Sequence, residues 1–329
     1  MNSPVARPSC AGWSRPAPAE TREMIVRPRP GLLTILFAMR GSILPKVAPQ
    51  VIVIAALSFL VVAIEQRHAA WFPVTAGIGP FTLVGLALSI FLSFRNGACY
   101  DRWWEARRAW GSLIVELRGL ARLLPALLPE PEHEALRRRC LRRGAGFAHA
   151  LHARLRGLDE TEALAPWLPS EELATLGQRP SGADAALTGL TRDLAGAAKA
   201  GALSDVLFVS LEHKIASLSA IQATCERIHG TPLPFAYTLL LYRTAWLYCL
   251  LLPFGLAGSL GWSTPIIAAL VAYAFFGLDA LGDELEEPFG TDANDLPLDT
   301  LLHTADAAIL DALGETGREA PKADRFMLR

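Results

Sequence analysis

The sequence predicts an all-α membrane protein with four transmembrane helices and a helical domain inserted between the second and the third. The first observation is composition: 52% of the 329 residues are hydrophobic, 19% are charged and the mean hydropathy is +0.30, above the usual balance of a soluble protein. The second is a set of four long apolar runs. The third is helical periodicity between these runs, without the alternation typical of strands.

The apolar runs have the length that a membrane-spanning helix needs. Residues 47–64 would extend about 27 Å at a rise of about 1.5 Å per residue. Residues 74–94 contain no charged side chain. The third and fourth runs, residues 235–257 and 263–280, meet in the segment LAGSLGWSTP, residues 256–265, whose Gly, Ser and Pro residues favour a turn. We therefore expect two helical hairpins.

The other segments complete the predicted organisation. Residues 1–22 are rich in Pro, Ala and Arg and lack the apolar segment of a signal peptide, so we expect a disordered tail. A single domain is expected over residues 23–305, with a cytosolic helical insert at about residues 95–234. Residues 306–329 are expected to form a C-terminal tail.

The distribution of basic residues predicts the orientation in the membrane. Arg27, Arg29, Arg40 and Lys46 precede the first span and six arginines follow the second, whereas the two opposite loops contain only Arg67. Because Lys and Arg accumulate on the cytoplasmic side, we expect a multi-pass protein of the cell inner membrane with both termini in the cytoplasm. The net charge of -1 gives no basic surface for nucleic acid.

The second span continues as one helix into charged sequence, because no proline follows until Pro125. Leu86, Ile90 and Phe94 recur every four residues and form a stripe of large apolar side chains. A neighbouring stripe of small residues permits close helix packing and consists of Gly85, Ser89, Ser93 and Gly97. Around an axis shared by several copies, the large stripe would form apolar rings that gate by dewetting. An ordinary stripe facing lipid or the helix bundle is the alternative.

Three segments carry a family resemblance. Residues 95–111, RNGACYDRWWEARRAWG, resemble the segment that follows the pore helix in bacterial bestrophins. Residues 225–244, CERIHGTPLPFAYTLLLYRT, and residues 273–299, YAFFGLDALGDELEEPFGTDANDLPLD, resemble the entry of the family's third span and the segment after its fourth. The resemblance covers roughly residues 23–305.

The resemblance implies a passive ion channel and not an enzyme. It implies a homopentamer in the lipid bilayer, whose pore neck for monovalent ions maps onto Leu86, Ile90 and Phe94. The family label suggests anion or chloride conduction, whereas characterised bacterial members favour cations, so cation conduction is held slightly ahead. A membrane scaffold or a transporter without channel activity is the alternative.

The resemblance also bears on metal binding, because eukaryotic members bind calcium through an acidic cluster after the fourth span. Asp292 and Asp295 remain at the matching positions, but Thr291 and Ala293 replace acidic residues. Calcium prefers six to eight oxygen ligands. We therefore expect no calcium switch and no cofactor, with Asp292 and Asp295 as weak calcium candidates.

Charged residues in and after the last two spans complete the predictions. Arg243 and Asp279 each lie 18 residues from Gly261, so a hairpin turning there would place them at similar depth and allow an ion pair. Snorkelling of Arg243 to the inner interface is the alternative. The run that follows is interpreted as a solvated face of a cytosolic helix and contains Asp283, Glu284, Glu286 and Glu287.

Overall fold

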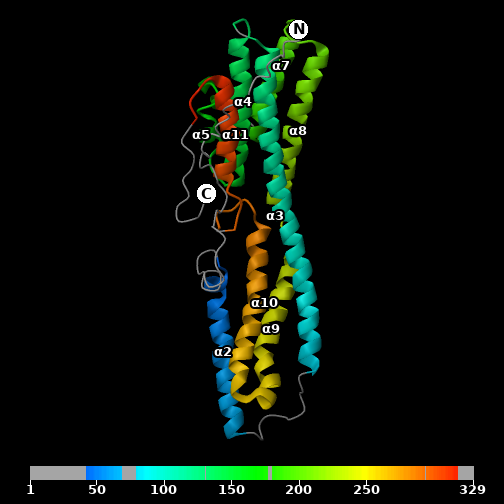
Figure 1. The fold of residues 1–329 in the computed structure, drawn as a ribbon, viewed down its shortest axis with the longest axis vertical. Coiled ribbons are helices and arrows are strands. Elements are labelled where there is room, and N and C mark those ends of the chain that lie inside the picture. The colour runs from blue at the N-terminus through cyan, green and yellow to red at the C-terminus, as the bar shows by residue number, and fades with distance from the viewer. Residues whose placement is uncertain (1–41, 69–78, 130, 177–179, 293, 318–329) are drawn as a thin grey trace, which may run out of the picture.

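The computed structural model describes residues 42–68, 79–129, 131–176, 180–292 and 294–317. Within these ranges every regular element is a helix, as the sequence predicts. The expected tail at residues 1–22 and the start of the second expected span lie outside the described residues. The molecule is elongated, and one long helix, α3 (Gly79–Leu127), runs along both of its halves (Figure 1).

One half contains the apolar helices. They are α2 (Leu44–Arg67), the first part of α3, α9 (Phe235–Leu260) and α10 (Thr264–Glu286). Three stretches are long and apolar enough to cross a membrane, namely Leu44–Arg67, Gly79–Leu127 and Phe235–Glu286. The last stretch contains both α9 and α10, which the short η2 (Gly261–Ser263) joins as an antiparallel hairpin (Figure 1). Gly261 has a φ of 50°, a conformation that glycine adopts without strain.

The apolar half has its own core between these helices. Ile54 of α2, Leu92 of α3 and Cys249 of α9 are fully buried there, and Ala268 and Ala272 of α10 allow close approach. Pro45 lies in the first turn of α2, where the missing N–H has no helical acceptor in any case. This packing fixes one side of α3 against α9 and α10.

The second half is a helical domain built around the other end of α3. It contains α4 (Glu134–Leu155), α5 (Glu160–Leu164), α6 (Ser170–Leu176), α7 (Gly182–Lys199), α8 (Asp205–Gly230) and α11 (Leu298–Leu313). Trp110 and Leu117 of α3 and Phe147 of α4 are completely buried in its core. The hydroxyls of Ser181 and Ser204 cap α7 and α8 by accepting the backbone N–H groups of the first turn. The predicted helical insert therefore packs as a true core.

The C-terminal boundary differs from the prediction. Residue 305 lies inside α11, which continues to Leu313 and buries Ile309 completely against the helical domain. The helix ends at Gly314, whose φ of 68° allows a left-handed cap. The predicted start of the tail at residue 306 was too early, because the apolar residues of this segment keep helical periodicity to residue 313.

Candidate functional site

In the apolar half of the molecule, α3 has one face buried in its own chain and the opposite face uncovered. Leu88, Leu92 and Arg95 are buried, whereas the predicted neck residues Leu86, Ile90 and Phe94 are 59%, 46% and 66% exposed. At roughly 100° per residue, the two sets lie about 180° apart around the helix axis. The predicted stripe therefore points directly away from the rest of the subunit.

The stripe of small residues winds from the buried to the uncovered side. A Cβ atom at Gly85 would lie 2.6 Å from the Tyr248 hydroxyl of α9, so glycine permits this contact between helices. The Ser89 hydroxyl donates to the Gly85 carbonyl at 2.8 Å. Ser93 is exposed, and a Cβ at Gly97 would meet no atom within 4 Å. Within one subunit, only Gly85 of this stripe serves close helix packing.

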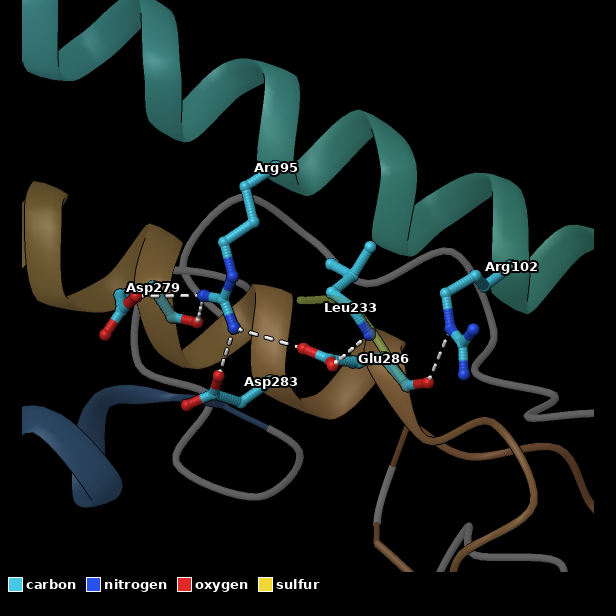
Figure 2. Close-up of polar contacts among 6 residues, drawn as sticks. All are labelled: Arg95, Arg102, Leu233, Asp279, Asp283 and Glu286. Atoms are coloured by element: carbon cyan, nitrogen blue, oxygen red, sulfur yellow. Dashed lines mark hydrogen bonds and ion pairs between the residues drawn. The ribbon is translucent and has the colours of Figure 1, made fainter. Parts of the chain in front are cut away.

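Directly after the predicted neck residue Phe94, Arg95 points into the subunit and binds three carboxylates of α10 (Figure 2). Its Nη1 donates to Asp279 Oδ1 at 2.9 Å and to the Asp279 carbonyl at 3.1 Å. Its Nη2 donates to Asp283 and, at 3.3 Å, to Glu286. The Arg95 side chain is completely buried, and the side chains of Asp279 and Glu286 are largely buried. The Asp283 side chain is 61% exposed.

The spacing of the three acids explains why they meet one guanidinium. Asp279, Asp283 and Glu286 are separated by four and three residues, so they share one face of α10. Gly282 lies on the same side, and a Cβ there would be only 3.0 Å from Arg95 Nη1. Glycine therefore lets α10 approach the arginine closely.

The Arg95 cluster, defined as Arg95 with Asp279, Asp283 and Glu286, also reaches the start of α9. The second oxygen of Glu286 accepts the backbone N–H of Leu233 at 3.0 Å. Two turns further along α3, Arg102 donates to the Glu286 carbonyl at 3.1 Å (Figure 2). It also donates to the carbonyls of Ile228 and Thr231 at the end of α8. A cation suits these helix C-termini. The part of α3 that leaves the apolar half is thus bound to α10, to the end of α8 and to the residues that precede α9.

The structure does not form the expected pair between Arg243 and Asp279. Asp279 is buried and binds Arg95, whereas Arg243 lies on an exposed side of α9. The prediction was wrong because counting residues from the hairpin turn gives depth along the helices but not direction around them. The partner of Asp279 comes from α3 instead.

The calcium candidates lie beside an ammonium group. Lys46 Nζ is 2.7 Å from Asp292 Oδ2 and 2.8 Å from Glu284 Oε1. Asp295 Oδ2 accepts the backbone N–H of Asp292 at 2.7 Å, and burial raises the pKa of Asp295 to about 6. A lysine ammonium between two of the carboxylates, and an Asp295 oxygen already used by a backbone N–H, do not fit a divalent cation. Within the described ranges, no group of three or more His, Cys, Asp or Glu residues is placed to hold a metal ion.

The family of this chain follows from its match to a known family model. Residues 24–311 match the family model described as bacterial and fungal bestrophin protein. The chain belongs to the bestrophin family. The sequence-based assignment to this family, and with it to the ion channels and not the enzymes, is confirmed.

Similar bestrophins include curated proteins and solved structures. A voltage-dependent anion channel-forming protein of Mesorhizobium japonicum is 46% identical over 93% of this chain and 98% of its own length. The voltage-dependent anion channel-forming protein YneE of Escherichia coli K12 is 40% identical over 87% of this chain and 93% of its own. The crystal structure of a bacterial bestrophin homolog from Klebsiella pneumoniae has a TM-score of 0.78 at 34% identity, covering 82% of this chain and 99% of that one.

The Arg95 cluster is the part of the site that sequence reasoning missed. The acids were interpreted as a solvated charge run, but Glu284 and Glu286 are largely buried and only Asp283 among the cluster acids is well exposed. The sequence did contain a signal for this cluster: the spacing of Asp279, Asp283 and Glu286 places three acids on one face of α10, and Arg95 stands at the end of an apolar stretch of α3. Separation of nearly 190 residues hid the partner.

Proposed function

We propose that five copies of this bestrophin-family chain assemble around an axis lined by α3 and conduct monovalent ions passively. In this arrangement α2, α3, α9 and α10 each cross the cell membrane once, with both termini in the cytoplasm. Leu86, Ile90 and Phe94 form three stacked apolar rings, the neck. The observation that carries the proposal is the exposed apolar line of α3, directed away from its own subunit.

The chemistry of the neck supports gating by water. A narrow ring of apolar side chains offers an ion no replacement for its hydration shell, and water leaves such a constriction readily. Conduction then requires the rings to widen or to become wetter. The buried Arg95 cluster behind Phe94 gives the helix a fixed support at this level.

The sign of the conducted ion is not set by the neck, because Leu86, Ile90 and Phe94 carry no charge. The names of the relatives favour anions for this chain. The expectation of cation conduction stays a prediction. Charged groups elsewhere along the ion path must decide between anion and cation conduction.

Planar bilayers containing the purified protein test the proposal. We expect wild-type currents with a small unitary conductance, and a larger open conductance when Leu86, Ile90 and Phe94 are all replaced by Ala. Phe91→Ala is the matched control, because Phe91 is 51% exposed on the same helix but lies about 100° from Ile90.

Two outcomes count against the proposal. Purified wild type without any ion flux would favour a membrane scaffold. A triple variant whose conductance equals that of wild type, or that Phe91→Ala reproduces, would contradict the placement of the neck.

A further inference from the structure

The uncovered face of α3 continues past the neck into the helical domain. Arg108 follows Ile90 by 18 residues, about five full turns, so the two side chains leave the helix in the same direction. Asp101 follows Ile90 by 11 residues and deviates from that direction by roughly 20°. Both charged residues are exposed, and α3 is one uninterrupted helix over this length.

Three other charged residues of α3 in this region are engaged inside the subunit. Glu105 pairs with Arg227 of α8 at 2.8 Å, and Glu116 pairs with Lys214 of α8 at 2.8 Å. Arg102 binds backbone carbonyls. Among the described residues, no ion pair or hydrogen bond within the subunit holds Asp101 or Arg108. These two charges are therefore available to an ion on the uncovered side.

We propose that Asp101 and Arg108 determine the charge selectivity of the channel. The proposal rests on the pore function above, because the ring geometry follows from five α3 helices around one axis. Each residue then forms a ring of five like charges. The two rings lie about 10 Å apart along the axis, since Arg108 follows Asp101 by seven residues. The Asp101 ring lies nearer the neck and attracts cations, while the Arg108 ring attracts anions.

The two rings oppose each other, so wild-type selectivity reflects their balance. Neutralising one ring leaves the other unopposed in a confined path, where charge acts more strongly than on an open surface. Removing Asp101 should therefore favour anions, and removing Arg108 should favour cations. The two substitutions are expected to shift the selectivity in opposite directions only if both charges face the same ion path.

Reversal potentials in planar bilayers under asymmetric KCl test this proposal. Asp101→Asn should shift the reversal potential toward the chloride equilibrium potential, with a severalfold rise in the chloride-to-potassium permeability ratio. Arg108→Gln should shift it the opposite way. Arg107→Gln is the matched control, because Arg107 carries the same charge but points about 100° away from Arg108.

Several results would overturn the proposal: unchanged reversal potentials in both variants, shifts in one direction for both, or an equal shift in the Arg107 control. The charge-preserving variants Asp101→Glu and Arg108→Lys should keep wild-type selectivity and so exclude a folding defect. A wild type that passes no current refutes the pore itself, whereas a conducting protein with insensitive Asp101 and Arg108 refutes only this assignment.

Discussion

Arg95 is a buried cation beside the proposed neck residue Phe94, and its role follows from its surroundings. Burying a guanidinium is costly unless carboxylates and carbonyls replace water around it. Asp279, Asp283, Glu286 and one carbonyl supply that replacement. Removing the arginine leaves buried acids facing each other without their cation.

Arg95→Met should lower the free energy of unfolding by about 3–5 kcal/mol, the usual loss when one partner of a buried ion pair is removed. Asp283→Asn should cost at most about 1 kcal/mol, because the Asp283 side chain is 61% exposed and solvent screens it. Unfolding in detergent micelles measures both. Equal losses for the two variants would contradict the buried cluster.

Asp295 gives a pH-dependent contribution to stability. Burial raises its pKa from 3.8 to about 6, so between these values the folded protein binds a proton that the unfolded chain releases. Stability from this group is therefore present at low pH and lost as pH rises through about 6. The difference in melting temperature, wild type minus Asp295→Asn, should decrease from pH 4 to pH 7. A constant difference would show that burial does not perturb Asp295.

At the scale of elements, α3 is the part that both cores share. Its buried side packs against α9 and α10 in one half and against α4, α8 and α11 in the other. The Arg95 cluster lies at the transition between the halves, where Gly282 of α10 leaves no room for a side chain beside α3. The contact between α3 and α10 therefore depends on a missing side chain.

Gly282→Ala tests that contact. Alanine favours a helix over glycine by about 1 kcal/mol, yet here its Cβ would meet Asn96 Oδ1 at 2.7 Å and Arg95 Nη1 at 3.0 Å. We expect a lower melting temperature in detergent. Gly277→Ala, on the same helix with no atom within 4 Å, should be neutral or stabilising. If Gly282→Ala is as stable as Gly277→Ala, the close approach is not required.

The sequence predicted elements better than contacts between them. Apolar length and the absence of proline located the helices, including the continuous course of α3, because these properties are local. Local periodicity also places Leu86, Ile90 and Phe94 on one face of α3, but the direction of that face away from the subunit comes from the packing of α3 against α9 and α10. The partner of Asp279 is not a local property either, since it depends on how α3 rotates against α10. The C-terminal tail was placed too early, from residue 306, although the apolar periodicity continues to residue 313.

At the scale of the whole molecule, one subunit leaves a long face of α3 uncovered in both halves. In the membrane half this face is apolar, and in the helical domain it carries Asp101 and Arg108. A closed ring of five subunits would turn this face toward a common axis. The neck and the charge rings then become successive parts of one ion path.

Mass spectrometry of the protein released from detergent should show five subunits. A ring gives every copy the same neighbours and leaves the α3 face toward a central opening, and the number five is the one that the resemblance to bestrophins implies. A monomer or dimer as the main species would contradict the ring, since neither can enclose an axis with α3.

The most direct test of the central claim is cysteine accessibility during current recording. Ile90→Cys should lose its current irreversibly when a bulky charged methanethiosulfonate reagent is added, because the modified ring fills the neck. Phe91→Cys, one residue further and off the ring, should keep its current, and wild type supplies the baseline because its four described cysteines are buried. Current that survives modification at Ile90→Cys, or that is lost equally at Phe91→Cys, would contradict a pore lined by this face of α3.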